Sequence, residues 1–178
     1  MRKKTLLCLI AAVLLVSCKT SDEASSQAMQ IYNVFKERIV ANAQNGSDSY
    51  DIPFNFTFEI HELEGDAVSY TVIIDEPKVL MNQVQMMALD PERTSESKME
   101  PSIGIFEEET YGLIPNQVDA SRGYPKGLAV NGESETNTFD IYVMVSYMEE
   151  NQSNVRVFFS TSIINGEVVY VKEVEHEE

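Results

Sequence analysis

Two cysteines and two histidines are the rarest reactive side chains of this 178-residue chain: Cys8, Cys18, His61 and His176. A catalytic thiol needs a paired base, and a zinc site needs several clustered Cys or His residues. Neither arrangement is present, and no G-x-S-x-G, H-E-x-x-H or phosphate-binding glycine loop occurs in the sequence. We therefore expect that the protein is not an enzyme, with an uncharacterised hydrolase as the weaker alternative.

The two cysteines lie in the amino-terminal segment "MRKKTLLCLIAAVLLVSCKT". Basic residues at positions 2–4 precede an apolar run from Leu6 to Val16, and Ser17 and Cys18 follow. Basic, apolar and then small residues in this order are typical of an export signal. The run is shorter than the roughly 20 apolar residues that a transmembrane helix needs. We therefore expect this segment to direct export.

The last four residues of the segment, Leu15-Val16-Ser17-Cys18, resemble the lipobox of bacterial lipoproteins, in which aliphatic and small residues precede a cysteine. The resemblance implies that residues 1–17 are a signal peptide, that the Cys18 thiol carries diacylglycerol, and that the new amino terminus carries an acyl group such as palmitate. Two acyl chains anchor a protein stably, whereas one binds marginally. Removal of Cys8 with the signal argues against a disulfide. The expected location is the extracytoplasmic face of the cell membrane, or the outer membrane in a two-membrane bacterium.

The chain is strongly acidic, with 13 basic and 29 acidic side chains and a formal net charge of −16. This charge argues against nucleic acid as a partner, because nucleic-acid binding needs a basic surface. Asp48 and Asp51, beside Gly46, are weak calcium candidates, but the regular calcium-loop pattern is missing. A solvated acidic surface is the favoured interpretation, and we predict no metal and no cofactor other than the lipid on Cys18.

Helical periodicity follows the anchor. Residues 18–26 are mostly small and polar, which predicts a tether from the membrane. Apolar residues then recur at spacings of three and four from Ala28 to Ala43, which predicts an amphipathic helix over 27–45. Asn45-Gly46 supplies a helix end that tolerates positive φ. We favour packing of this helix on the domain over a helix that binds a partner or lies on the membrane. The membrane version is the weaker alternative, because the polar face of the helix is not especially basic.

From Pro53 onward the apolar period is two. The segments "PFNFTFEIHEL" and "VSYTVIIDE" predict a hairpin over about 53–76. Near the carboxy terminus, "TFDIYVMVSYM", "NVRVFFSTSII" and "EVVYVKEVE" predict a three-stranded meander with a tight turn at Asn165-Gly166. Val79–Ala88 is a less regular third strand, and short apolar pieces at 103–106 and 128–130 are candidate strands.

About seven or eight strands and one helix predict a mainly β chain, with an antiparallel β-sandwich over residues 50–175. The strand count resembles an immunoglobulin-like or fibronectin type III-like sandwich. Residues 90–137 are rich in turn formers, and long connections in a compact domain are often functional. Tyr and Arg are favoured at binding hot spots. The candidate binding surface therefore comprises Tyr111, Leu113, Ile114, Arg122 and Tyr124, although these residues could equally cover the open end of the sandwich.

Together these features predict a lipid-anchored envelope protein that acts as a binding or adaptor module for a protein, a peptide or a glycan. A structural or assembly subunit of a cell-envelope complex is one alternative. A calcium-dependent binding domain is a weaker one.

Overall fold

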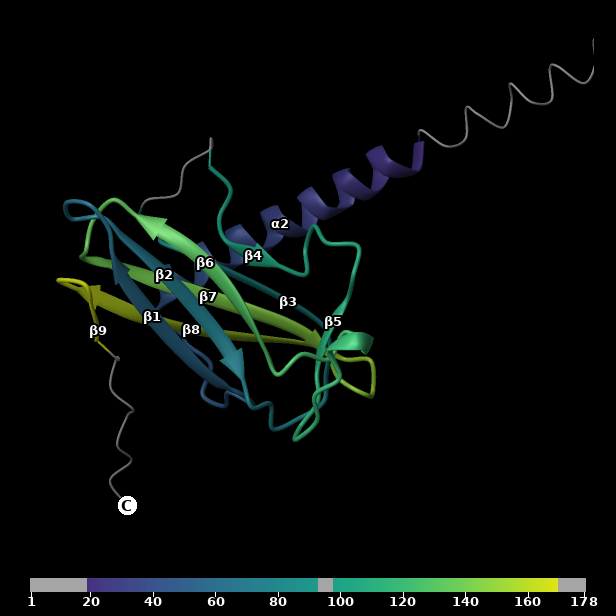
Figure 1. Ribbon diagram of the computed structural model, residues 1–178. Coiled ribbons are helices and arrows are strands. Elements are labelled where there is room, and N and C mark those ends of the chain that lie inside the picture. Colours follow the sequence, from purple (N-terminus) through teal and green to yellow (C-terminus); the bar gives the residue numbers. More distant parts are fainter. Residues whose placement is uncertain (1–18, 93–97, 170–178) are drawn as a thin grey trace, which may run out of the picture.

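The computed structural model describes residues 19–92 and 98–169 (Figure 1). The signal segment, Cys18 and His176 lie outside the described residues. In chain order the elements are α2 (Lys19–Asn45), β1 (Asn55–Glu62), β2 (Val68–Asp75), β3 (Met81–Leu89), β4 (Ser102–Ile103), β5 (Tyr111–Leu113), the 3-10 turn η1 (Ala120–Arg122), β6 (Gly127–Ser134), β7 (Phe139–Met148), β8 (Asn154–Ile164) and β9 (Glu167–Val169).

The strands form two antiparallel sheets. The smaller sheet has the order β1-β2-β6, and the larger has the order β4-β3-β7-β8-β9, with β5 also paired to β3. The orders β1-β2-β6 and β3-β7-β8 are those of strands A-B-E and C-F-G in an immunoglobulin-like sandwich. The prediction of a mainly β sandwich preceded by one helix is confirmed, and the described residues contain nine strands.

Both regions of regular alternation form the predicted strand pairs. β1 and β2 make a hairpin with Phe58 opposite Val72, and β7, β8 and β9 make an antiparallel meander. Asn165 and Gly166 both have positive φ at the β8–β9 turn, as a type I′ turn requires. The side chains of one face of each sheet meet in a single core that includes Phe54, Ile74 and Phe159.

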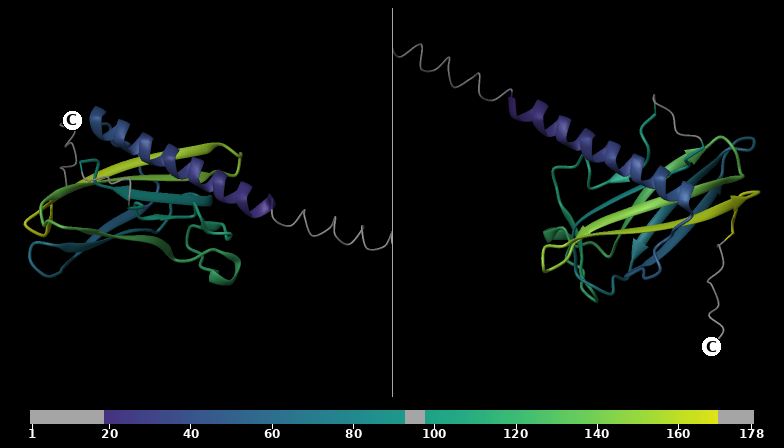
Figure 2. Two further views of the ribbon diagram at one scale, coloured as in Figure 1. Left: turned by 90° about the horizontal axis from the view of Figure 1, so that it is seen from above. Right: turned by 180° about the vertical axis from the view of Figure 1, so that it is seen from behind.

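α2 forms a third layer on the outer face of the larger sheet (Figure 2). Its side chains Tyr32, Phe35 and Ile39 are buried against Met87 of β3 and Met144 of β7. The larger sheet therefore has apolar side chains on both faces. This packing explains why β3 lacks a period of two, since a strand covered on both faces reads as a nearly continuous apolar run.

The helix begins at Lys19, earlier than the predicted start at residue 27. Residues 19–26, predicted as a tether, are therefore helical. The segment contains neither glycine nor proline, so nothing in it interrupts the backbone hydrogen bonds of the helix. Its polarity is explained by exposure, because Ala24, Ser25, Ser26 and Gln27 are exposed to solvent.

The edge of β3 carries an interrupted strand. β4 pairs with Met86 and Met87, and β5 pairs with Met81 and Val84, so the two short strands follow one another along the same edge. Between them Gly104 has a φ of 76°, and a Cβ there would lie 2.3 Å from the Val84 carbonyl oxygen. The turn at Gly104 directs the chain toward the helix, where the Phe106 ring lies 5.6 Å from that of Tyr32.

Candidate functional site

A hollow of about 620 Å³ lies at one end of the larger sheet, and we call it the β5 hollow. Four segments line it: the start of β3, the residues around β5, the turn after η1, and the β7–β8 turn. The side chains that line it are mostly polar or aromatic and include Asn82, Gln83, Tyr111, Arg122, Tyr124, Glu149, Glu150 and Gln152. Segments that are distant in the sequence therefore converge on one surface.

The structure brings together three of the five residues predicted as a binding surface. Tyr111, Arg122 and Tyr124 all line the β5 hollow. The prediction for Leu113 is wrong, because this side chain is 0% exposed and belongs to the core between the sheets. Leu113 pairs with Met81 of β3, and this strand register turns its side chain inward. Ile114 is half-buried and forms an isolated bridge with Gln117, outside the lining of the hollow.

Tyr124 is positioned by two glycines. A Cβ at Gly112 would lie 2.6 Å from Cε1 of Tyr124, so the tyrosine ring lies directly over the backbone of β5. The Gly112 N–H donates a 2.8 Å hydrogen bond to the Gly123 carbonyl, which ties the turn after η1 to β5. The backbones of Asp119 and Tyr124 are joined by hydrogen bonds of 2.7 and 3.0 Å. The ring is therefore held on a hydrogen-bonded support.

Arg122 is the cationic group of this surface. Its side chain is 78% exposed, and its Nε lies 3.5 Å from Oδ2 of Asp119. An ion pair at such exposure contributes little to stability, because water screens both charges. The planar guanidinium retains donors that can pair with a carboxylate or a carbonyl of a ligand.

Two glutamines of the hollow have left-handed backbone conformations. Gln83 has a φ of 50° and Gln152 a φ of 63°, and both line the β5 hollow. Gln83 lies at an irregularity of β3, between the pairs of Asn82 and Gln85 with β7. Non-glycine residues at positive φ are uncommon and concentrate at binding sites. The sequence analysis missed Gln83, because no local signal marks a bulge in a strand of irregular pattern, and it missed Gln152, which lies in the β7–β8 turn.

The two calcium candidates, Asp48 and Asp51, lie in the loop between α2 and β1. The Asp48 carboxylate accepts hydrogen bonds from the backbone N–H and the hydroxyl of Ser160. Asp51, three residues later in the chain, is exposed to solvent. Within residues 19–92 and 98–169, no group of three or more His, Cys, Asp or Glu residues is placed to hold a metal ion. His61 lies exposed on β1, opposite Ser69 of β2.

Two titratable residues with raised pKa values, Glu100 and Tyr70, lie beside β6. Glu100 and Tyr70 line a hollow of about 640 Å³ between β6 and residues 98–101. Burial raises the pKa of Glu100, and Lys36 of α2, 3.6 Å away, partly opposes this shift. Burial also raises the pKa of Tyr70, and the charge of Glu100 adds to that effect. The Glu100 N–H donates a 2.7 Å hydrogen bond to Oη of Tyr32, so this segment is fastened to the helix.

No protein-family model matches the chain, and no curated protein matches it. A solved structure described as "X-ray structure of Northeast Structural Genomics Consortium target SoR45" is similar over 70% of this chain and 95% of that one, at 12% identity and a TM-score of 0.39. Among the described residues, no helix is both long and apolar enough to cross a membrane.

Proposed function

We propose that this protein is a lipid-anchored, extracytoplasmic binding module that engages a protein, peptide or glycan of the cell envelope through the β5 hollow. The observation that carries the proposal is the convergence of Tyr111, Arg122 and Tyr124 with the left-handed residues Gln83 and Gln152 around one hollow. Aromatic rings and a guanidinium supply contact area and directed hydrogen bonds. The amide side chains add donors and acceptors suited to a peptide backbone or a sugar hydroxyl.

The anchor half of the proposal rests on the lipobox and on the direction of α2. The helix begins at Lys19, directly after Cys18, and its amino-terminal part extends beyond the sheets (Figures 1 and 2). The part of α2 before Ile31, where packing on the sheet begins, comprises residues 19–30 and is about 18 Å long at 1.5 Å per residue. A lipid on Cys18 would therefore hold the sandwich away from the membrane surface through a helical spacer.

The two other functions considered have less support. A subunit that assembles through the exposed side of α2 would need an apolar stripe there. The large exposed apolar residues of the described helix are Met29 and Val34, and their spacing of five places them on different faces. An enzyme using His61 is also disfavoured, because this residue lies on β1, outside the lining of the β5 hollow.

Cross-linking in intact cells, followed by mass spectrometry of the captured partners, tests the binding proposal. A photoreactive residue at Arg122 should capture a specific partner, whereas the same residue at Glu59, on the smaller sheet, should not. Gln152→Ala should lower the yield at position 122 without changing the amount of folded protein. Equal capture from both positions, or capture of nothing from position 122, would contradict the proposal.

The anchor is tested separately by fractionation. Cys18→Ala should move the protein from the membrane fraction to the soluble extracytoplasmic fraction, because the thioether-linked lipid cannot form. Cys8→Ala is the matched control and should leave the distribution unchanged. A Cys18→Ala protein that has lost residues 1–17 and still stays with the membrane would rule out the lipid anchor but would leave the binding proposal untouched.

A further inference from the structure

The lining of the β5 hollow is poor in aliphatic side chains. Among the described residues that form it, Met148 is the only aliphatic one, and the others are tyrosines, glycines and polar or charged residues. The fully buried core of a protein–protein interface is more apolar than the surface around it. The hollow therefore suits a ligand that is polar over most of its surface better than the apolar centre of a protein interface.

The ring of Tyr124 supplies a fixed aromatic surface in the hollow. A Cβ at Gly112 would lie 2.6 Å from Cε1 and 2.9 Å from Cδ1 of this ring, so the β5 backbone covers one of its sides. The side chain is half-buried, and it lines the hollow. The face of an aromatic ring is electron-rich and attracts polarised C–H groups. A sugar ring presents such C–H groups on one face and can pack against the tyrosine.

Three amide side chains, those of Asn82, Gln83 and Gln152, line the same hollow. An amide carries an acceptor oxygen and two N–H donors, and a hydroxyl both donates and accepts. One amide can therefore bind two neighbouring hydroxyls of a sugar, one through its oxygen and one through its nitrogen. The Gln152 N–H donates a 3.0 Å hydrogen bond to the Glu149 carbonyl, which fixes the backbone of the turn that carries this amide.

Charged groups of both signs line the hollow, namely the guanidinium of Arg122 and the carboxylates of Glu149 and Glu150. Oε2 of Glu149 accepts a 3.3 Å hydrogen bond from Nδ2 of Asn151, so this carboxylate is held in the β7–β8 turn. A ligand group of either charge would lie near a group of its own sign, and such contacts are costly. A neutral ligand avoids this cost, and its hydroxyls can donate to the carboxylates and accept from the guanidinium.

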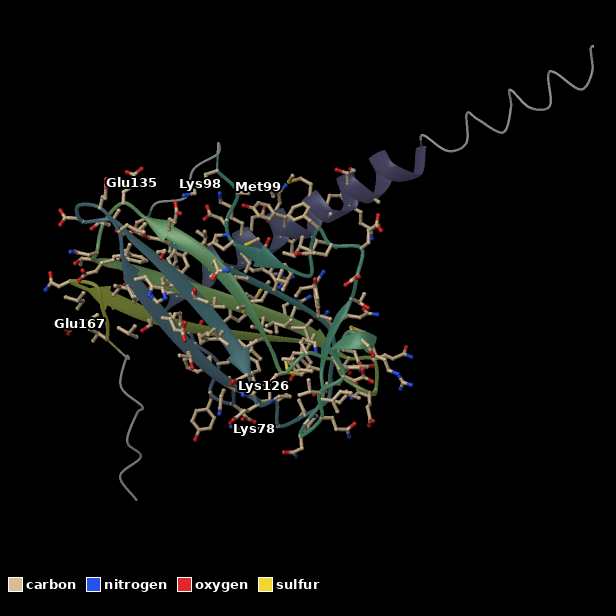
Figure 3. All side chains as sticks on the ribbon, viewed as in Figure 1. Lys78, Lys98, Met99, Lys126, Glu135 and Glu167 are labelled. Carbon is tan, nitrogen blue, oxygen red and sulfur yellow. The ribbon has the colours of Figure 1, made fainter. Side chains whose placement is uncertain are left out.

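The dimensions of the hollow fit a short run of sugar rings. Its volume of about 620 Å³ lies within the range of about 300–1,000 Å³ that is usual for sites that bind small molecules. The hollow lies at the end of the sandwich away from Glu135 and Glu167, as the position of β5 in Figures 1 and 3 shows. That opposite end therefore provides control positions that are remote from a ligand in the hollow.

We propose that the β5 hollow binds a neutral glycan, with a sugar ring against Tyr124 and its hydroxyls paired with the amides of Asn82, Gln83 and Gln152. This inference rests on the function proposed above and names the ligand class. A peptide has fewer hydroxyls and usually offers apolar side chains, for which the described lining provides little besides Met148 and the tyrosine rings. Capture of a peptide is therefore the competing outcome of the test.

Photo-crosslinking of the full chain in intact cells tests the ligand class. A diazirine amino acid at Thr110, which is exposed and lines the hollow, serves as the probe, and the same amino acid at Glu167, at the other end of β8, is the control. Tryptic peptides that contain position 110 should carry added masses of hexose or hexosamine residues, whereas those from position 167 should not. A peptide adduct at position 110 alone would overturn the glycan and keep the proposed function. Sugar at both positions, or no adduct at either, would contradict both proposals.

Substitutions test the arrangement within the hollow, with circular dichroism of each variant to check that the domain is folded. Tyr124→Ala should lower the yield of sugar adduct about tenfold, whereas Tyr124→Phe keeps the ring and should stay within about twofold of the unmodified chain. Gln152→Ala should lower the yield about two- to tenfold, because one amide is lost. Gln117→Ala, which alters an exposed glutamine outside the hollow, is the matched control and should change nothing. Equal effects of the two Tyr124 variants, or of the two glutamine variants, would overturn the proposal.

Discussion

The carboxylate of Asp48 accepts two hydrogen bonds from Ser160, one from the backbone N–H at 2.9 Å and one from the hydroxyl at 2.7 Å. Next to it, the Ser49 N–H donates to the Phe158 carbonyl at 2.8 Å, and the Phe158 N–H donates to Oγ of Ser49 at 2.9 Å. The loop after α2 thus occupies part of the β8 edge that β9 leaves open. An uncovered edge would invite pairing with another chain.

Replacing Asp48 should therefore weaken the fold and expose this edge. We expect Asp48→Ala to lower the free energy of unfolding by about 0.5–1.5 kcal/mol, the usual net contribution of a hydrogen bond, because the carboxylate is exposed to water. Urea denaturation measures this loss, and light scattering should detect a greater tendency to associate. Asp51→Ala, in the same loop, removes an equal charge and should change neither quantity. An equal loss in both variants would assign the effect to net charge.

The contact between helix and sheet is tested at Ile39, which is 0% exposed among Met87, Leu89 and Met144. Ile39→Ala leaves a cavity in close-packed surroundings and should cost about 2–5 kcal/mol. Val34→Ala, on the same helix but 44% exposed, should stay within about 0.5 kcal/mol of the unmodified chain. Denaturant unfolding of both variants provides the comparison. A small effect at Ile39 would mean that α2 is only loosely attached.

Gly132 and Tyr70 form a pair across β6 and β2. A Cβ at Gly132 would lie 2.2 Å from Cζ of Tyr70, so Gly132→Ala must displace the ring. We expect a loss of about 1–3 kcal/mol, the usual cost of overpacking. Because Tyr70→Val removes the obstruction, the two substitutions together should cost less than the sum of the single losses in a double-mutant cycle. Strict additivity would show that the two residues are not coupled.

Glu100 should make stability depend on pH. Burial raises its pKa in the folded protein above the ordinary value of 4.5, so the folded state binds the proton more tightly than the unfolded state. The free energy of unfolding should therefore fall as the pH rises from the ordinary pKa through the raised one. Urea titrations between about pH 4 and pH 7 should show a shallower fall for Glu100→Gln than for the exposed-site control Glu59→Gln. Parallel profiles for both variants would contradict this assignment.

Much of the fold could be predicted because apolar and polar residues alternate along a strand wherever one face of the strand is more exposed to water than the other. Phe58 and Val72 of the β1–β2 hairpin are inward residues of this kind. β3 could not be predicted as clearly. Its adjacent residues Met86 and Met87 are both 0% exposed, because one faces the smaller sheet and the other faces α2. A strand that is covered on both faces by apolar layers has no polar face, so its sequence does not alternate between apolar and polar residues.

The candidate binding surface could be predicted only in part, because some of its residues leave no signal in the sequence. Tyr111, Arg122 and Tyr124 were recognisable by residue type alone, since rings and guanidinium groups in long connections favour binding. Leu113 was misassigned because a three-residue strand is too short to show alternation. Gln83 reaches the hollow through a left-handed backbone conformation that depends on the pairing of β3 with β7, and Gln152 through one in the turn between β7 and β8.

The position of α2 also sets the order in which the chain can fold. The helix is made first, but its partners Met87 and Met144 come from β3 and from β7, and β7 begins only at Phe139. At about 5–20 residues per second of synthesis, the apolar stripe of the helix waits several seconds for its partners. During that interval Tyr32, Phe35 and Ile39 are open to solvent or to a chaperone. A chaperone could therefore bind the apolar side of α2 until β7, in the last third of the chain, has been synthesised.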